Sequence, residues 1–194
     1  SAGGRAVAIQ ADNADQDAVA EAVERTVREL GRLDILVNSA GIISVGPIEQ
    51  LTARQRDEII AVNVTAAFTA AQAASRHLNE GGRIISIGSN LAQRVPSPGM
   101  TLYAMTKSAL DGLTKALARE LGPRGITANV VHPGSTDTDM NPADGPSADA
   151  QRAISALGRY GTTEDIAATV AHLAGPGGRS ITGASLLVDS GTNA

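Results

Sequence analysis

Short apolar segments alternate with longer amphipathic segments along the whole of this 194-residue chain, and this alternation constrains the fold more than any other feature. The segments expected to be strands are residues 6–10, 33–37, 83–87, 126–131 and 184–188. The segments expected to be helices are residues 15–30, 52–78, 101–121 and 163–173. Strands that alternate with helices form parallel sheets covered on both faces. The pattern therefore predicts an α/β fold: a doubly wound parallel sheet in three layers, α/β/α.

The chain is predicted to form a single domain over residues 1–194, because it contains no internal repeat, linker or low-complexity tract. Residues 135–157 differ from the rest in being rich in Pro, Asp, Ser and Gly, with a short helix expected over residues 148–157. We expect this segment to be a lid over a substrate site. It has no arginine before Arg152 to hold a carboxylate or phosphate, which favours an uncharged carbonyl substrate.

The composition argues against several classes of protein. A net charge of −4 without a basic run argues against nucleic acid or an anionic membrane as the main partner. No apolar run approaches the ~20 residues of a membrane-spanning helix. The chain has no cysteine, which fits a reducing compartment, and we expect a cytoplasmic protein. His77, His132 and His172 are scattered without carboxylates at ligand spacing, so they are interpreted as structural or surface residues and no metal site is predicted.

Tyr103 and Lys107 lie four residues apart in the predicted helix over residues 101–121, so their side chains share one helix face. An ammonium beside a phenol favours the phenolate, and we expect Lys107 to lower the pKa of Tyr103. Such a phenol can donate or accept a proton at a carbonyl or carbinol oxygen. By itself the pair is equally compatible with an incidental arrangement on a surface helix, so the interpretation depends on the surrounding motifs.

Several short motifs of this chain occur in one order in a known family of enzymes. They are Asn38-Ser39-Ala40-Gly41 after a strand, Asn63 within a helix, Ser89 after a strand, Tyr103 with Lys107, Pro133-Gly134, Ile181-Thr182-Gly183 and Val188-Asp189. Together they span essentially the whole chain and resemble the short-chain dehydrogenase/reductase family, the 3-oxoacyl-thioester reductase branch in particular. The resemblance implies a Rossmann-like form of the α/β fold. One departure is Ser190, which stands where the family has a glycine.

The resemblance implies four catalytic residues. Tyr103 would be the general acid/base, and Lys107 would lower its pKa and bind the nicotinamide ribose. Ser89 would hold the substrate oxygen, although a serine at a strand end also suits an ordinary turn. Asn63 would hold a water that links Lys107 to solvent. An asparagine inside a helix is also compatible with a packing or kink role.

The resemblance also implies a dinucleotide site, with NADP(H) expected rather than NAD(H). Besides Tyr103 and Lys107, its expected residues are Asp12, Asn13, Asn38, Ala40 and Gly41 on the adenosine side, and Pro133, Gly134, Thr136 and Thr138 on the nicotinamide side. Parallel sheets bind ligands beyond the carboxyl ends of their strands, which is where these residues fall. Gly134 would let backbone amides approach the ligand closely. Ordinary turns remain the alternative for each group.

The beginning of the chain departs from the family pattern. The family opens with a β-α-β-α unit whose Gly-rich turn holds the pyrophosphate, and this chain has no counterpart of it. We expect a chain truncated by roughly 50 residues. Two strands would then be absent between residues 6–10 and 33–37, which leaves a gap in the sheet. Ordinary dinucleotide binding should fail in a chain that begins at Ser1.

Three functions remain open from the sequence. The leading one is an NAD(P)-dependent oxidoreductase that interconverts a carbonyl and a secondary alcohol by hydride transfer. The second is a non-catalytic regulatory protein of the same fold, because the loop over residues 133–146 resembles that of a biofilm-dispersal protein that binds cyclic di-GMP. The third is an inactive fragment of either. The alanine-rich segment over residues 66–74 would let a second copy approach, so a homodimer or homotetramer is expected.

Overall fold

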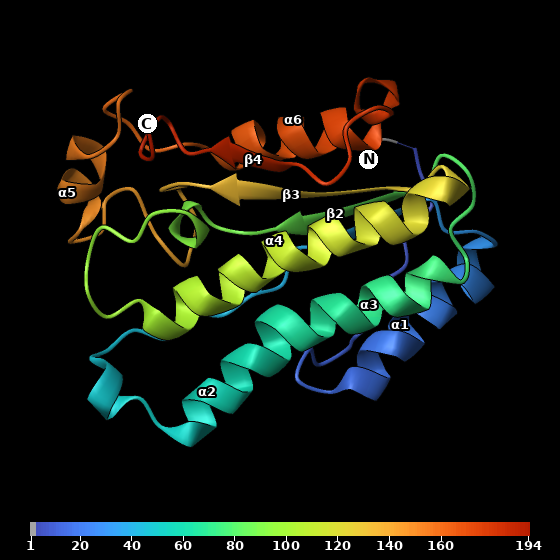
Figure 1. Cartoon of the computed structure of the whole chain (residues 1–194), viewed down its shortest axis with the longest axis horizontal. Helices are drawn as coiled ribbons and strands as arrows, with labels where there is room; N and C mark the ends of the chain where they lie inside the picture. The colour runs from blue at the N-terminus through green and yellow to red at the C-terminus, as the bar shows by residue number, and fades with distance from the viewer. Residues whose placement is uncertain (1–2) are drawn as a thin grey trace.

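A computed structural model describes residues 3–194, and its core is one parallel sheet of four strands in the order β1-β2-β3-β4 (Figure 1). Residues 1 and 2 of the predicted domain lie outside the described part. The strands are β1 (Ile35–Asn38), β2 (Arg83–Ile87), β3 (Thr127–Pro133) and β4 (Ser185–Val188). Helices lie on both faces of the sheet, so the predicted three-layer, Rossmann-like fold class is confirmed.

One face of the sheet is covered by α1 (Gln16–Leu30), α3 (Ala66–Ser75) and α4 (Thr101–Leu121). The alanines of α3 allow close packing, and they form an apolar cluster with Val19 and Val23 of α1 and Ile84 of β2. The ends of α1 follow from its sequence. The Asp15 carboxylate accepts the N–H groups of Asp17 and Ala18, and Gly31 takes the left-handed conformation after the last turn.

The opposite face is covered by α6 (Thr163–Ala174). Leu173 of α6 packs against Ile85 of β2 and Val131 of β3, and all three are buried. Alternate residues of β2 therefore face opposite layers, as the pleat of a strand requires. The remaining short elements are η1 (Ile48–Gln50), η3 (Asn90–Ala92), η4 (Gly122–Arg124), α5 (Ala148–Ala153) and η5 (Pro176–Gly178). The helix predicted over residues 148–157 is thus shorter than expected.

The long helix predicted over residues 52–78 consists of three pieces. It begins as α2 (Ala53–Ile60) after a capping box of Thr52 and Gln55, passes through a π-helical segment, η2 (Ala61–Thr65), and continues as α3. The π-helical segment contains the buried Asn63. A π-helical turn inserted in an α-helix often occurs at functional sites.

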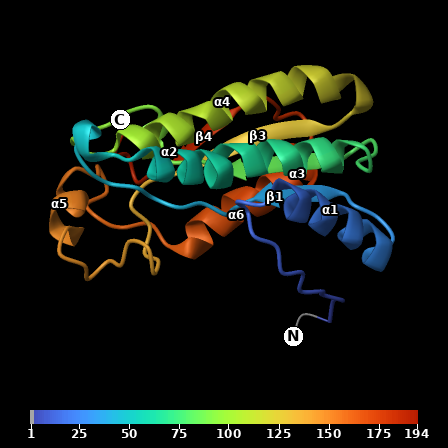
Figure 2. The same ribbon diagram turned by 90° about the horizontal axis from the view of Figure 1, so that it is seen from below.

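Residues 6–10 form no strand, which corrects the prediction for this segment. The physical reason is that a strand needs a hydrogen-bonded neighbour, and the segment lies apart from β1 (Figure 2). β1 is one of the two edge strands of the described sheet, and Ile35 and Val37 are each 42% exposed. Two open apolar cavities, of about 280 and 230 Å³, lie between β1 and the region of α1.

Candidate functional site

The predicted catalytic residues lie where β2 ends and the first turns of α4 pass over it. Ser89 follows β2 directly, and Tyr103 and Lys107 lie on α4. Asn63 comes from η2, and its side chain contacts Thr106 of α4. The parallel strands place their carboxyl ends at this edge of the sheet, so residues far apart in the chain meet there.

Lys107 is 4% exposed, and its ammonium Nζ donates a hydrogen bond of 2.9 Å to the Ile87 carbonyl at the end of β2. Nζ lies 5.7 Å from the centroid of the Tyr103 ring. Burial lowers the pKa of Lys107 to about 8, because a charged ammonium loses hydration in this position. The same lysine that the sequence motif singled out is therefore a buried cation that can release its proton close to neutral pH.

The pKa of Tyr103 is raised above its ordinary value, which corrects the expectation that Lys107 lowers it. Burial of the phenol is the largest cause, and a side-chain hydrogen bond with Ser89 offsets part of it. The Lys107 ammonium is directed to the Ile87 carbonyl rather than to the phenol oxygen. Tyr103 is therefore a protonated phenol at neutral pH, ready to act as a proton donor.

Ser89 has the contacts of a turn serine together with a contact to Tyr103, and its role in holding a substrate oxygen stays a prediction. Its Oγ accepts the N–H of Leu91 at 3.2 Å and caps η3, as a turn serine does. The hydroxyl also hydrogen bonds with the Tyr103 side chain, and its own backbone N–H donates to Nδ1 of His132 at 3.0 Å. The serine is buried and held at its backbone as well as at its hydroxyl.

Asn63 is 2% exposed, and its side-chain amide holds the loop that follows β1. Its Oδ1 accepts the Ile42 N–H at 2.8 Å, while its Nδ2 donates to the Ile42 carbonyl at 2.9 Å and to Thr106 Oγ1 at 3.1 Å. Both amide hydrogens are thus used within the protein. A Cβ on Gly41 would lie 3.1 Å from Lys107 Nζ, so this glycine lets the loop approach the lysine. The packing and kink role of Asn63 is visible in the structure, and the water relay stays a prediction.

The residues predicted on the adenosine side divide into two groups. Asn13, Asn38 and Ala40 line the cavity of about 280 Å³ beside β1. Asp12 does not line this cavity, because its carboxylate accepts the N–H of Ala14 at 2.9 Å in the turn before α1. The turn interpretation therefore describes Asp12 in this structure, and Gly41 lies at Lys107 and Asn63 instead.

The residues predicted on the nicotinamide side follow β3. A Cβ on Gly134 would lie 2.6 Å from Asp189 Cα, and the Gly134 N–H donates to the Val188 carbonyl. The missing side chain therefore makes room for the C-terminal backbone, and the approach of backbone amides to a ligand at Gly134 stays a prediction. Pro133 ends β3, and the Thr136 hydroxyl donates to the Gly134 carbonyl. Thr138 is exposed and pairs with Asn141 in a turn.

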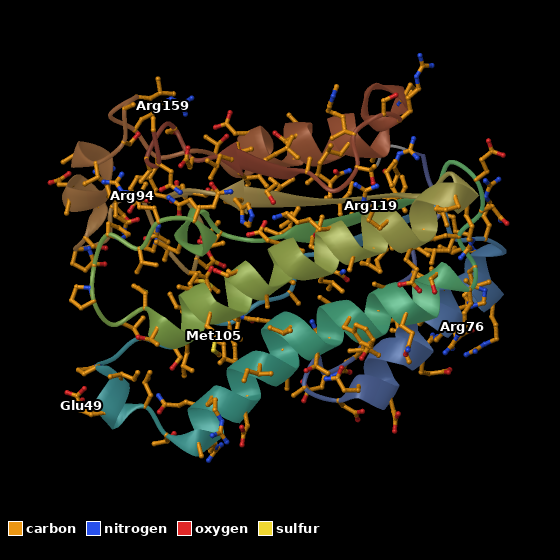
Figure 3. The ribbon with its side chains drawn as sticks, in the orientation of Figure 1. Glu49, Arg76, Arg94, Met105, Arg119 and Arg159 are labelled. Atoms are coloured by element: carbon orange, nitrogen blue, oxygen red, sulfur yellow. The ribbon has the colours of Figure 1, made fainter. Side chains whose placement is uncertain are left out.

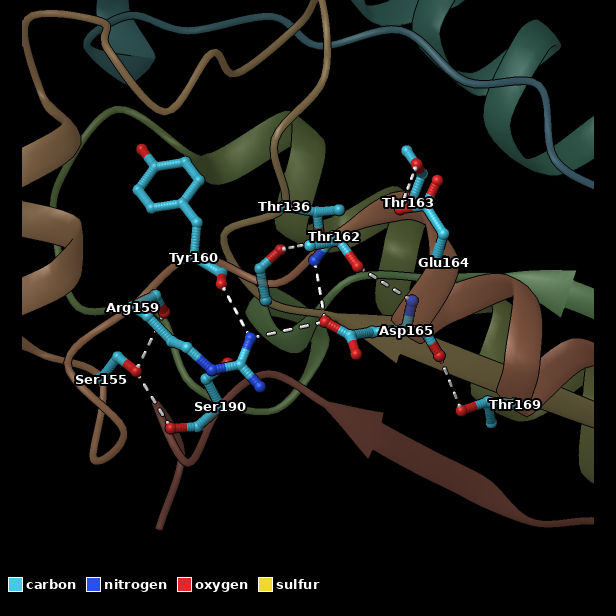
Figure 4. A network of polar contacts seen from close by, with 11 residues as sticks. Thr136, Ser155, Arg159, Tyr160, Thr162, Thr163, Glu164, Asp165, Thr169 and Ser190 are labelled. Carbon is cyan, nitrogen blue, oxygen red and sulfur yellow. Dashed lines mark hydrogen bonds and ion pairs between the residues drawn. The ribbon is translucent and has the colours of Figure 1, made fainter.

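The predicted lid is attached to the start of α6 through a polar network (Figure 4). Thr162 and Asp165 form a capping box at α6, and Arg159 donates to the Tyr160 carbonyl and to the Asp165 carboxylate. At the end of the lid, the Ser155 hydroxyl donates to the Ser190 carbonyl at 3.0 Å. Arg94, which is labelled in Figure 3, follows β2 in the chain. Its guanidinium donates to the Thr192 carbonyl and so ties this segment to the C-terminal turn.

The pair of His132 and Asp111 was not predicted from the sequence to be part of this site. His132 was interpreted as structural, yet its imidazole contacts both Ser89 and Asp111. A signal for Asp111 was present in the sequence, because it lies two helical turns after Tyr103 on the same helix face. No cluster of His, Cys, Asp or Glu within residues 3–194 has the arrangement of a metal site. In that same range, none of the helices has the length and hydrophobicity required to cross a membrane.

Fold and site together define an α/β protein with a Ser/Tyr/Lys cluster, its serine and lysine buried, at the carboxyl ends of its parallel strands. A family model described as enoyl-(acyl carrier protein) reductase matches residues 1–193. The cyclic-di-GMP-binding biofilm dispersal mediator protein of Escherichia coli (strain K12) is 46% identical over 184 residues, which cover 95% of this chain and 76% of that protein. The chain belongs to the short-chain dehydrogenase/reductase family.

Solved structures of relatives agree closely with this one. A dehydrogenase/reductase from Sinorhizobium meliloti 1021 is 63% identical, with a TM-score of 0.98 over all of this chain and 77% of its own. A short chain dehydrogenase from Burkholderia cenocepacia J2315, solved in complex with NADP, is 59% identical with a TM-score of 0.98. That match covers 99% of this chain and 78% of the Burkholderia chain.

Proposed function

We propose that this protein is an NADP(H)-dependent oxidoreductase that interconverts a carbonyl and a secondary alcohol. The observation that carries the proposal is the meeting of Ser89, Tyr103 and Lys107 at the end of β2. There a protonated phenol hydrogen bonds with a hydroxyl beside a buried ammonium whose pKa is about 8. The Burkholderia relative that binds NADP, and the family as a whole, support the cofactor.

The protein's own groups divide the work between them. The Ser89 hydroxyl holds the substrate oxygen, and Tyr103 gives that oxygen its proton during reduction or removes it during oxidation. Lys107 supplies positive charge next to the developing oxyanion, in a position where burial strengthens its effect. Asn63 holds the loop at Ile42 against α4 and so maintains the spacing of these groups. A water held by Asn63 and a lid over residues 135–157 are parts of the same proposal.

The residues present fit the nicotinamide end of a dinucleotide. Bound there, the dinucleotide supplies or accepts the hydride. Lys107 and Tyr103 would hold its ribose, with Pro133, Gly134, Thr136 and Thr138 beside the nicotinamide. Asn13, Asn38 and Ala40 line a cavity at the adenosine side, where Asp12 and Gly41 also belong to the proposed site. The Gly-rich turn that would hold the pyrophosphate is not among the motifs of this sequence.

The proposal also covers the oligomeric state, the substrate class, the domain organisation and the cellular location of the protein. Phe68 on α3 and Met105 on α4 are about half exposed, so the surfaces of these helices offer apolar area to a second copy. We therefore include a homodimer or homotetramer in the proposal. A small uncharged carbonyl compound as substrate, a single domain and a cytoplasmic location complete it.

A second candidate function is a regulatory protein that binds cyclic di-GMP. The identity of 46% with the Escherichia coli biofilm dispersal mediator favours it. This function does not need Ser89, Tyr103 and Lys107 to be arranged for proton transfer, whereas the structure brings them together. The arrangement therefore favours the enzyme.

Replacing the phenol tests the proposed function. All variants are made in a form that carries the Gly-rich β-α-β-α unit of a relative ahead of Ser1, so that NADPH can bind. In that form Tyr103→Phe should lower kcat for NADPH-dependent reduction by about 10²–10⁴, because it removes the proton donor. The Kd for NADPH should change less than about twofold. The matched control is Tyr160→Phe, on the lid side of the sheet, which should keep most of the turnover. A Tyr103→Phe variant with unchanged turnover, or a wild type that binds cyclic di-GMP and never NADPH, would contradict the proposal.

A further inference from the structure

The imidazole of His132 contacts the backbone of Ser89 where strands β2 and β3 separate. β2 pairs with β3 as far as Ile87, opposite Val131, while β3 continues beside β4 to Pro133. The Ser89 N–H lies beyond the last paired residue of β2, and it donates to His132 Nδ1 at 3.0 Å. The His132 side chain thus accepts the Ser89 N–H at a point where β2 is no longer paired with β3.

One tautomer of His132 satisfies all its contacts. Nδ1 accepts a backbone N–H and therefore carries no hydrogen, so the ring hydrogen of the neutral imidazole lies on Nε2. Nε2 lies 2.9 Å from Asp111 Oδ1 and donates to it. Asp111 also accepts the Ser185 hydroxyl of β4. The ring is fully buried and held at both nitrogens, which fixes its orientation.

Gly88 provides the space for this imidazole. A Cβ at Gly88 would lie 2.2 Å from His132 Nδ1 and 2.5 Å from Cε1. The ring therefore occupies the place that a side chain at this position would take. The Gly88 N–H donates to the Val131 carbonyl, so the residue before Ser89 is held by β3 as well.

The helix that carries Tyr103 holds the end of β2 at two points. Lys107 donates to the Ile87 carbonyl, and Asp111 acts through His132 on the Ser89 N–H. Tyr103, Lys107 and Asp111 follow one another at four-residue spacing, so one face of α4 provides the phenol and both attachments. The position of the Ser89 hydroxyl relative to the phenol is therefore set by α4 itself.

We propose that His132 and Asp111 are positioning residues, which hold the Ser89 backbone so that the Ser89 hydroxyl stays beside Tyr103. The inference rests on the proposed function, in which Ser89 holds the substrate oxygen. It assigns to His132 a role that depends on one hydrogen-bond acceptor, Nδ1. The role needs no proton transfer by the imidazole. An amide oxygen at the same place should replace it in part.

The first test compares turnover in His132 variants of the form that carries a relative's Gly-rich β-α-β-α unit ahead of Ser1, with ethyl acetoacetate as an uncharged carbonyl probe and NADPH. His132→Leu fills the space without an acceptor and should lower kcat roughly tenfold to a hundredfold with the KM for NADPH nearly unchanged. His132→Asn offers an amide oxygen to the Ser89 N–H and should restore part of the loss. Asp111→Ala lies at a partly exposed helix position and should lower kcat less, with the folded state retained. His77→Leu removes a histidine that pairs with Glu24 on the far helices and should leave kcat unchanged.

The second test needs neither cofactor nor substrate. In a Tyr160→Phe background, tyrosinate absorbance reports Tyr103 alone, because the chain has only two tyrosines. The Ser89 hydrogen bond lowers the pKa of Tyr103, so Ser89→Ala and His132→Leu should both raise it further, and His77→Leu should not. A folded His132→Leu or Asp111→Ala variant with unchanged Tyr103 titration and unchanged kcat would overturn the positioning role. Unchanged turnover in Ser89→Ala would contradict the proposed function, while the titration still decides the positioning role.

Discussion

At the scale of single residues, Lys107 is the side chain whose protonation the fold alters most clearly. It is buried beneath the end of β2, and its pKa falls to about 8 because the ammonium loses hydration. Below this pH both the folded and the unfolded chain carry the proton, and the folded state bears the cost of burying it. Above it the folded lysine is neutral, while the unfolded lysine stays charged up to about pH 10.4. Folding stability should therefore rise with pH in this interval.

Comparison with a Lys107→Met variant isolates this effect. Between about pH 7.5 and 9.5, the free energy of unfolding of the wild type should increase by about 1–2 kcal/mol relative to the variant. Tyr103 does not interfere, because its raised pKa places its titration above this interval. Urea unfolding at several pH values measures the difference. Parallel pH profiles for the two proteins would show that the folded lysine keeps its ordinary pKa.

Ser190 is a second residue that yields a prediction, because its backbone conformation is strained for a residue with a Cβ. It adopts a φ of 55°, in the left-handed region that favours glycine, at the position where the family has glycine. Ser190→Gly should stabilise the protein by up to about 1 kcal/mol, because the strain of the Cβ disappears. Ser190→Ala keeps the Cβ and serves as the control, with no gain expected. Thermal unfolding would contradict the account if the glycine variant melted below the alanine variant.

At the scale of elements, the π-helical segment η2 and the turns around the strand ends shape the site. The side chain of Asn63 in η2 hydrogen bonds with the backbone of Ile42. Its Oδ1 accepts the Ile42 N–H, and its Nδ2 donates to the Ile42 carbonyl. The element thus interrupts the α-helical hydrogen bonding of the long helix and fixes the loop after β1. Its contribution should therefore appear in stability as well as in activity.

Truncation of Asn63 measures that contribution. Asn63→Ala should lower the free energy of unfolding by about 1–3 kcal/mol, because it leaves partly buried backbone groups of Ile42 unpaired. Asn79→Ala, at an exposed position, should change it by less than about 0.5 kcal/mol. Equal stability of the two variants in urea unfolding would mean that water satisfies Ile42 without the amide.

The elements also show how far the sequence supports prediction. β2 and α4 begin and end at the predicted residues, because apolar spacing and flanking glycines determine them locally. Residues 6–10 have strand-like composition but no strand, since pairing depends on neighbours rather than on the segment itself. The hydrophobic periodicity of residues 52–78 did not indicate the π-helical turn, and Asn63 was its only mark in the sequence.

The candidate site, like the fold, could be predicted from the sequence only in part. The motif places Tyr103, Lys107 and Ser89 correctly in relation to one another, because helix spacing and strand ends can be derived from the chain. The direction of the Tyr103 pKa was wrong, since burial is a property of the folded molecule and outweighs the nearby charge. The close approach of Gly134 to Asp189 was not predicted, because the two residues are distant in sequence. His132 was missed for the same reason, as Ser89 and Asp111 meet it only across the sheet and α4.

At the scale of the whole molecule, the open edge of the sheet bears directly on cofactor binding. Ile35 and Val37 of β1 are exposed, and cavities of about 280 and 230 Å³ separate β1 from the region of α1. The proposed catalytic residues meet around β2 and α4, whereas the pyrophosphate of the proposed cofactor would have to be held beyond β1. Affinity for the dinucleotide should therefore depend on the Gly-rich β-α-β-α unit expected from the family.

Titration calorimetry with NADPH tests the central claim most directly. It compares this chain with a form that carries, ahead of Ser1, the Gly-rich β-α-β-α unit of a relative. The account predicts that the extended form binds NADPH and that this chain binds it far more weakly. Tyr103→Phe in the extended form should keep the affinity and lose the turnover. An extended form that folds but binds no NADPH would contradict the assignment of this protein as a cofactor-dependent oxidoreductase.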